Sequence, residues 1–146
     1  MTRICFICLG NICRSPMAEY ILKQKLKDNN IKDIIVESRA ISYEEQGNPI
    51  YPEAKKVLLK NNIEVGNHTA KRIEKDDINK FDYFICMEDY HVSASKNILG
   101  NNISIFKLTD YDIEDPWYTR NFDKVYKEID ESCNNILSII KNNKSL

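Results

Sequence analysis

The sequence predicts an α/β fold in which a small four-stranded parallel sheet is flanked by helices on both faces. Short apolar runs that are typical of buried strands alternate with segments of helical spacing. Such alternation favours parallel strands joined by right-handed crossovers. The four expected strands are Arg3 to Cys8, Ile34 to Ser38, Asp82 to Met87, and Ile103 to Leu108.

Three helices can be placed from the spacing of their apolar residues. The first is expected to begin at Ser15-Pro16, because serine is a good N-cap and proline suits the first helical position, and to end at Asn29-Asn30. The second is expected over Glu53 to Lys60, with Pro52 in its first turn. The last carries apolar residues at helical spacing from Phe122 to Ile140.

Composition and charge restrict the class of protein. A chain of 146 residues with 42% hydrophobic and 29% charged residues suits one globular domain spanning 1–146. The formal charge of -1 supplies no basic field to gather a nucleic-acid backbone, so we expect no nucleic-acid partner. We also expect a monomer with no membrane association. Five cysteines, an odd number in a chain without a recognisable export signal, indicate reduced thiols in the cytoplasm.

The segment from Cys8 to Ser15 joins the first expected strand to the first expected helix, and it has the features of a phosphate-binding loop. Backbone NH groups and the helix dipole favour an anion at this point. Gly10 and Asn11 tolerate positive φ, which lets successive NH groups turn inward. Arg14 can fork onto two phosphate oxygens. The same positive environment favours the thiolate of Cys8, which can attack phosphorus.

The stretch Ile-Cys-Leu-Gly-Asn-Ile-Cys-Arg-Ser-Pro-Met-Ala-Glu, from Ile7 to Glu19, resembles the signature of the low-molecular-weight protein tyrosine phosphatases. The similarity continues through Ser38, Phe81-Asp82-Tyr83, Cys86-Met87 and Asp115-Pro116-Trp117-Tyr118. The family fold, a small parallel sheet flanked by helices, agrees with the strand and helix pattern. The resemblance implies hydrolysis of phosphotyrosine and aryl phosphates through a phosphocysteine intermediate, without metal or cofactor. It implies tyrosine-phosphorylated proteins as partners, with phosphate and related oxyanions as ligands.

The resemblance also assigns roles to individual residues. It implies Cys8 as the nucleophile, Arg14 as the phosphate clamp and Asp115 as the general acid and base. From the residues alone, three other acids would serve equally well: Asp110, Asp112 and Glu114. The phosphate-binding loop is completed by Leu9, Gly10, Asn11, Ile12, Cys13 and Ser15. Ser15 is further expected to hydrogen-bond the Cys8 sulfur, and Cys13 to form a reversible, protective disulfide with Cys8.

Supporting residues and a substrate pocket can be named in the same way. Ser38 and His68 are expected to hold Asn11 in its backbone geometry. The pocket is expected to include Trp117 and Tyr118 beside the acid, together with a variable loop after the second strand. In that loop Glu44 stands where the family often has an aromatic residue, and the adjacent Tyr43 is the expected substitute. Glu44 and its neighbour Glu45 should disfavour acidic peptides through like-charge repulsion.

Two other functions are compatible with the loop from Cys8 to Ser15. Thioredoxin-coupled arsenate reductases resemble this fold and loop, but they relay oxidation through two further cysteines. Cys86 stands near the first of these positions, whereas Ser93 occupies the second. A non-catalytic phosphotyrosine or oxyanion-binding module needs the loop but has little reason to keep both a nucleophile and an acid. We therefore favour the phosphatase.

Overall fold

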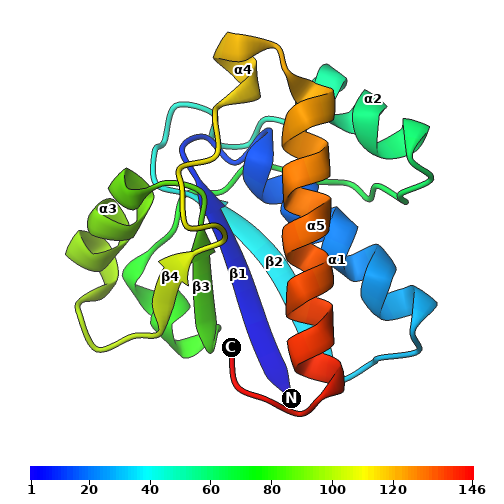
Figure 1. Cartoon of the computed structure of the whole chain (residues 1–146). Coiled ribbons are helices and arrows are strands. Elements are labelled where there is room, and N and C mark those ends of the chain that lie inside the picture. Colours follow the sequence, from blue (N-terminus) through cyan, green and yellow to red (C-terminus); the bar gives the residue numbers. More distant parts are fainter.

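The computed structural model describes residues 1–146 and contains one sheet of four parallel strands in the order β2-β1-β3-β4 (Figure 1). The strands are β1 (Thr2–Cys8), β2 (Ile34–Ala40), β3 (Tyr83–Cys86) and β4 (Ile105–Lys107). Each strand lies within two residues of its predicted limits. The predicted fold class is therefore confirmed.

The three predicted helices are present as α1 (Arg14–Asp28), α2 (Pro52–Lys60) and α5 (Phe122–Lys141). Three further elements gave no clear periodic signal, namely the 3-10 helix η1 (Lys75–Asn79) and the helices α3 (Asp89–Leu99) and α4 (Pro116–Thr119). The buried residues of α3 are His91, Ser95 and Leu99, so its inner stripe is mostly polar and lacks apolar spacing. None of the helices has the length and apolar character that a membrane crossing requires.

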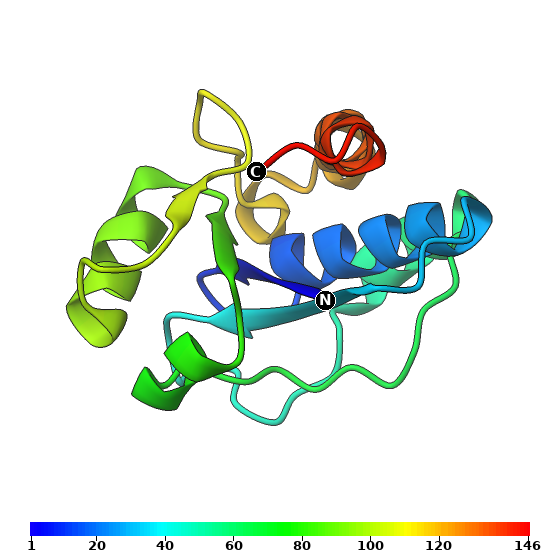
Figure 2. The same ribbon diagram turned by 90° about the horizontal axis from the view of Figure 1, so that it is seen from below.

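Both faces of the sheet are covered, because alternate residues of β1 point into two different cores. Ile4, Phe6 and Cys8 belong to the larger apolar cluster, which α1 and α5 close. Cys5 and Ile7 belong to the smaller cluster on the other face, where α3 packs. Figure 2 shows α1 and α5 on one side of the sheet and η1 on the other. The central strand is thus buried on both sides, as its continuous apolar run predicts.

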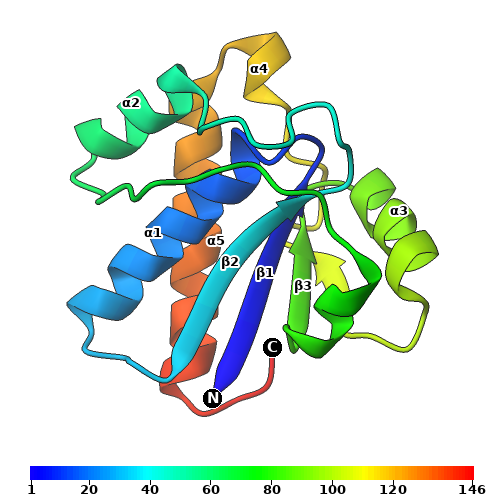
Figure 3. The same ribbon diagram turned by 180° about the vertical axis from the view of Figure 1, so that it is seen from behind.

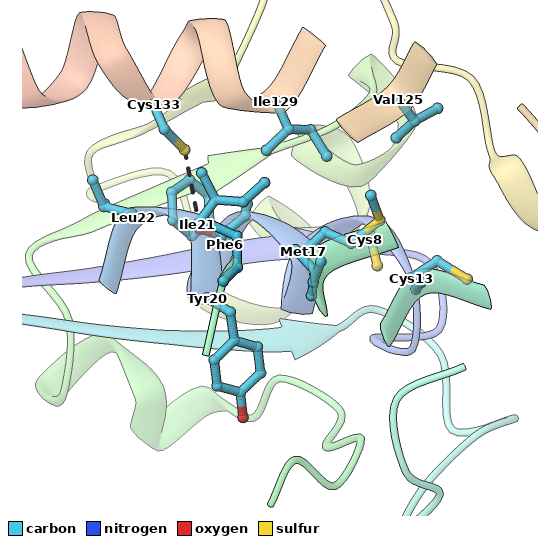
Figure 4. Close-up of a cluster of buried hydrophobic side chains, with 14 of the residues drawn as sticks. Phe6, Cys8, Cys13, Met17, Tyr20, Ile21, Leu22, Val125, Ile129 and Cys133 are labelled. Atoms are coloured by element: carbon cyan, nitrogen blue, oxygen red, sulfur yellow. Dashed lines mark hydrogen bonds between the residues drawn. The ribbon is translucent and has the colours of Figure 1, made fainter. Parts of the chain in front are cut away.

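The larger cluster fixes the start of α1 against the end of β1. Figure 4 shows Met17 and Ile21 of α1 facing Val125 and Ile129 of α5, with Cys8 at one end of the same cluster. Met17, Ile21, Val125 and Ile129 are all fully buried. Burial of an aliphatic side chain of this size contributes roughly 1.5–3 kcal/mol relative to its exposure. The loop between β1 and α1 is therefore anchored at both of its ends.

The topology places a binding site at the carboxyl end of β1. From β1 the chain passes through α1 to β2 on one side, whereas β3 pairs with the other side of β1. Ligands in open parallel sheets bind at such a switch point, outside the carboxyl ends of the strands. In Figure 3 the segment that follows α2 crosses in front of α1 and the carboxyl end of β2 before it reaches η1. Both chain termini lie at the opposite end (Figure 1).

Candidate active site

The loop from Cys8 to Arg14 turns directly from the end of β1 into the first turn of α1. Asn11 takes a left-handed conformation with φ of 61°, and its backbone NH donates to the Cys8 sulfur at 3.3 Å. Cys13 is the N-cap of α1, and its side chain makes no capping hydrogen bond. The NH groups of the first turn are therefore left for an anion.

Gly10 does not adopt the positive φ that its residue type allowed, so Asn11 alone provides this turn. Glycine is favoured at position 10 because there is little room for a side chain: a Cβ there would lie 3.2 Å from Cγ of Glu45.

Ser15 differs from its predicted place as the N-cap and lies instead in the first turn of α1, fully buried. Its hydroxyl is 3.0 Å from the Cys8 sulfur, as expected, and it accepts a hydrogen bond from Nδ2 of Asn11 at 2.7 Å. Because Asn11 supplies that donor, the Ser15 proton is free to point at the sulfur. The only other acceptor near Ser15 is the Arg39 carbonyl at 3.5 Å. The hydroxyl is therefore directed at the Cys8 sulfur rather than at the end of the helix.

A hydrogen-bond network holds the left-handed Asn11 from behind the loop. Nδ2 of Asn11 donates to Ser38 Oγ at 2.9 Å, and Ser38 donates onward to Oε1 of Glu19 at 2.6 Å. The Lys71 backbone NH donates to Oδ1 of Asn11 at 3.0 Å, and Nε2 of His68 lies 2.7 Å from the Asn11 carbonyl. The contacts expected of Ser38 and His68 are present, and Glu19 and Lys71 complete them.

Arg14 is almost fully buried at the base of the site, with 1% of its surface exposed. Its Nη1 lies 2.6 Å from Oε2 of Glu88 and donates to the Ile113 carbonyl at 2.6 Å. Glu88 was not named from the sequence. It follows the end of β3 by two residues, so the rule that parallel strands present functional groups at their carboxyl ends could have indicated it.

Asp115 is the acid that the structure brings to Arg14, with Oδ2 3.5 Å from Nη2. It is the N-cap of α4, where Oδ1 accepts the Trp117 NH at 3.0 Å. Asp112 is paired with Lys107 at 2.9 Å. Glu114 accepts hydrogen bonds from Lys124 and Asn121, which lower its pKa to about 2 and make it a poor proton donor. Of the acids left open by the sequence, only Asp115 lines the same cavity as Cys8 and Arg14.

The cavity that Cys8, Arg14 and Asp115 line, here named the catalytic cavity, has a volume of about 130 Å³. Cys8, Arg14 and Asp115 meet in its wall. The remaining lining residues are Leu9, Gly10, Ile12, Cys13, Glu44, Glu45, Trp117 and Tyr118. The prediction that Tyr43 joins this wall is wrong, because Tyr43 lines none of it. Its ring instead packs under the Arg72 guanidinium at 4.7 Å, and the two glutamates occupy the rim.

All five cysteines are free and buried. Only Cys8 both lines the cavity and has two hydrogen-bond donors next to its sulfur. Burial raises the pKa of Cys13 well above its usual range, with the charge of Cys8 as a second cause. Burial likewise raises the pKa of Cys86 to about 12. Cys86 is fully buried, and no second cysteine accompanies it on α3, where Ser93 stands. A cysteine relay of the reductase type has no support here.

The sequence and the fold both match known phosphatases. Residues 3–146 match the family model described as low molecular weight phosphotyrosine protein phosphatase. The chain is 39% identical over 153 aligned positions to the low molecular weight protein-tyrosine-phosphatase PtpA of Staphylococcus aureus, with 100% of this chain and 98% of that protein covered.

Two solved structures show the same arrangement. One is YfkJ from Bacillus subtilis, with a TM-score of 0.92, 32% identity and coverage of 99% of this chain and 98% of the other. The second is SP-PTP, a low molecular weight protein tyrosine phosphatase from Streptococcus pyogenes, with a TM-score of 0.88, 35% identity and coverage of 94% and 92%. With a family model that matches nearly the whole chain and a loop that holds Cys8 and Arg14 at one cavity, this chain belongs to the low molecular weight phosphotyrosine protein phosphatase family.

Proposed function

We propose that this chain is a protein tyrosine phosphatase that hydrolyses phosphotyrosine and aryl phosphates through a phosphocysteine intermediate on Cys8. The observation that carries the proposal is the meeting of Cys8, Arg14 and Asp115 in the wall of one cavity. These residues supply a nucleophile, a phosphate clamp and a proton donor. A module that only bound phosphotyrosine would need the clamp but neither of the other two groups.

The depth and the walls of the cavity favour an aromatic phosphate ester. Cys8 and Arg14 are 3% and 1% exposed, so a phosphoryl group must reach the base of the cavity to contact them. The side walls include Leu9, Ile12 and Trp117, which present apolar surface to a planar ring. A short aliphatic phosphoester such as phosphoserine would place its backbone against these walls before the phosphate reached the sulfur.

In the first step the Cys8 thiolate attacks phosphorus in line with the tyrosine oxygen. The sulfur–phosphorus bond forms as the phosphorus–oxygen bond to tyrosine breaks, and Arg14 with the loop NH groups balances the charge on the phosphoryl oxygens. Asp115 enters as a carboxylic acid and gives its proton to the leaving phenolate oxygen. The products are tyrosine and phosphocysteine.

In the second step water attacks phosphocysteine while the Asp115 carboxylate removes its proton. Inorganic phosphate forms as the sulfur–phosphorus bond breaks and Cys8 leaves as a thiolate. The Ser15 hydroxyl at 3.0 Å and the Asn11 NH at 3.3 Å stabilise the sulfur as it regains its charge. The cycle returns Cys8 to the thiolate and Asp115 to the carboxylic acid, which is the starting state of the enzyme.

The test is hydrolysis of p-nitrophenyl phosphate, a phosphotyrosine peptide and its phosphoserine counterpart. The wild type is expected to hydrolyse the two aryl esters and not the phosphoserine peptide, in the presence of a chelator and with inhibition by vanadate. Cys8→Ser should be inactive. Asp115→Asn should lose roughly 10²- to 10⁴-fold in kcat, the usual contribution of a general acid. Asp110→Asn is the matched control, because Asp110 does not line the cavity.

Other outcomes would point to the alternatives. Reduction of arsenate with thioredoxin, without hydrolysis of aryl phosphates, would favour the reductase. Tight binding of the phosphotyrosine peptide by a wild type that does not turn it over would favour a binding module.

We also propose that Cys13 protects Cys8 by forming a reversible disulfide under oxidation. Both residues line the same cavity, and both thiols are free in the structure. Peroxide should oxidise the Cys8 thiolate to a sulfenic acid, which the Cys13 thiol then attacks with release of water. After treatment with peroxide, a thiol reductant should restore the wild type fully but Cys13→Ser only partly. Equal recovery of the two proteins would contradict the disulfide.

We propose that residues 1–146 act as one domain, as a monomer in the cytoplasm, on tyrosine-phosphorylated proteins. One sheet supports both apolar clusters, which favours a single cooperative unit. The five free cysteines suit a reducing compartment. A single unfolding transition, sedimentation at the mass of one chain, and cell fractionation test these three statements in turn.

A further inference from the structure

A second hollow, here named the side groove, lies beside the catalytic cavity and shares Leu9, Asp115 and Tyr118 with it. Its volume is about 370 Å³, which is on the scale of small-ligand pockets. The other residues of its lining are Glu88, Tyr90, His91, Asp112, Ile113 and Glu114. Phosphoryl transfer as described above uses the shared residues but leaves the rest of the groove without a role.

The side groove is lined by four carboxylates and by no lysine or arginine. Cations do approach these acids from outside the groove. Arg14 binds Oε2 of Glu88 and Lys107 binds Oδ1 of Asp112, so each of these two acids keeps one carboxylate oxygen that these cations do not use. Lys107 is also 3.4 Å from Asp89, and Lys124 is paired with Glu114. When Arg14 turns its charge to a phosphoryl group, the groove becomes still more negative.

His91 brings a buried polar atom without a hydrogen-bond partner to the wall of the groove. The residue is 1% exposed, it lines the groove, and its Nδ1 has no hydrogen-bond partner. Its Nε2 lies 3.5 Å from Oε2 of Glu88, an arrangement that favours the proton on Nε2 and leaves a lone pair on Nδ1. Such a buried acceptor requires a donor from a ligand or from water. Together with the four carboxylates, this acceptor favours a ligand that brings NH groups.

The rim of the groove suits a long aliphatic chain that ends in a positive charge. Tyr90 and Tyr118 both line the groove, and they are 64% and 70% exposed. Aromatic rings at a rim pack against methylene groups and attract a cation over their faces. A metal ion is a poor fit, because no three His, Cys, Asp or Glu side chains come close enough to hold one.

We infer that the side groove is a subsite for the lysine or arginine side chain of a residue close to the phosphotyrosine in a substrate protein. The ammonium or guanidinium group donates to the remaining oxygens of Glu88 and Asp112 and to Nδ1 of His91, while the rim tyrosines cover its stem. The inference rests on the proposed tyrosine phosphatase activity, because the shared walls of the two hollows place the cation beside a phosphoryl group on Cys8.

The test compares kcat/KM for phosphotyrosine peptides that carry one arginine at each position from three before to three after the phosphotyrosine. Peptides with alanine or glutamate at the same positions are the reference. At one position or two neighbouring ones, arginine is expected to raise kcat/KM about fivefold over alanine at low salt, the scale of a partly exposed ion pair. The ratio should fall as salt is added. A flat arginine scan from an enzyme that still hydrolyses p-nitrophenyl phosphate overturns the subsite alone, whereas loss of both activities overturns the phosphatase.

Charge reversal at Asp112 locates the subsite. We compare kcat/KM for the peptide with arginine at the preferred position with kcat/KM for the peptide with glutamate there. In Asp112→Lys the ratio of these two values should invert, and in Asp112→Asn it should approach one. Asp110→Asn, which removes a nearby charge outside the groove, should keep the wild-type ratio. The inference fails if Asp112→Lys keeps the arginine preference. It fails equally if only Glu44→Gln and Glu45→Gln remove that preference, because the cation then binds at the opposite rim.

Discussion

Glu88, in the wall of the side groove, holds the Arg14 guanidinium with Oε2 2.6 Å from Nη1. The Ile113 carbonyl accepts from the same nitrogen at 2.6 Å. A buried arginine without such partners would swing toward the nearest acceptor, and a second acceptor, Asp115, lies 3.5 Å from Nη2. We therefore expect Glu88 to act as a positioning residue that keeps the arginine from closing on Asp115.

Removal of this partner should impair phosphate binding as well as turnover. We expect Glu88→Ala to lower kcat/KM for p-nitrophenyl phosphate about tenfold to a hundredfold, the range for a lost hydrogen bond to a charged group. Affinity for vanadate should fall in parallel. Partial unfolding would reduce the amount of active protein, but it would not change the vanadate affinity of the molecules that remain folded. Asp89→Asn is the control, because the Asp89 side chain is 81% exposed and contacts Lys107 rather than Arg14. Unchanged vanadate affinity in Glu88→Ala would contradict the positioning role.

Ser38 should matter for both stability and rate, since it links Asn11 to a buried Glu19. Ser38→Ala leaves a buried carboxylate oxygen and an amide NH without a partner, which costs roughly 1–3 kcal/mol. The left-handed Asn11 is then less restrained, and kcat/KM should fall in the same variant. Urea unfolding and steady-state kinetics check the two effects. Ser42→Ala is the control, because Ser42 Oγ accepts only an exposed NH from Glu44. If Ser42→Ala lost as much stability and kcat/KM as Ser38→Ala, the special role of Ser38 would be contradicted.

His91 should make the protein less stable in mild acid. Burial, with the charge of Arg14 as the second cause, lowers the pKa of His91 from 6.5 to about 3. Between these values the unfolded chain binds a proton that the folded chain does not. The stability that neutral His91 contributes is therefore complete above pH 6.5 and is lost as the pH falls toward 3.

The measurement is denaturant unfolding of the wild type and His91→Gln at about pH 7.5 and about pH 5.5. The wild type should lose about 1.4 kcal/mol more than the variant over this interval, because each pH unit below the unfolded pKa contributes that amount. Equal losses in the two proteins would show that His91 does not remain neutral in the fold.

Glu44 and Glu45 should act against acidic substrates, because both place a carboxylate at the rim of the catalytic cavity. In the double variant Glu44→Gln, Glu45→Gln, kcat/KM should rise for phosphopeptides with acidic flanks relative to those with basic flanks. A change of about twofold to fivefold is expected, and it should shrink in high salt. The same relative kcat/KM before and after the substitution would sink this prediction. Activity toward p-nitrophenyl phosphate, which has no peptide flank, serves as the internal control.

Much of the site could be predicted because it is local in sequence. The loop from Cys8 to Ser15 carries its own turn residue and helix start, so the nucleophile and the clamp follow from consecutive residues. The strands were found for a similar reason, since apolar runs mark buried β1 and β3. Ser38 and His68 were placed by family resemblance, and their contacts with Asn11 are present.

The parts that sequence could not supply depend on tertiary contacts. Tyr43 was expected at the pocket because it adjoins Glu44, but the partner available in the fold is Arg72, and the ring turns away to pack under it. Ser15 looked like a helix cap, yet the sulfur of Cys8 competes successfully for its hydroxyl. Glu88 is distant from Arg14 along the chain, and helix α3 buries a polar stripe, so neither produced a periodic signal.

In the proposed mechanism the phosphoryl group passes through the sulfur of Cys8, and its capture there is the most direct test of that mechanism. The wild type is mixed with an aryl phosphate, and a denaturing quench stops the reaction within one turnover. Peptide mass spectrometry then locates the phosphorylated residue. The phosphoryl group should be found on Cys8 in the peptide that spans the loop, and Cys8→Ser should show neither this modification nor turnover. Turnover by Cys8→Ser at the wild-type rate, or a wild type that turns over with the phosphoryl group on another residue, would contradict it.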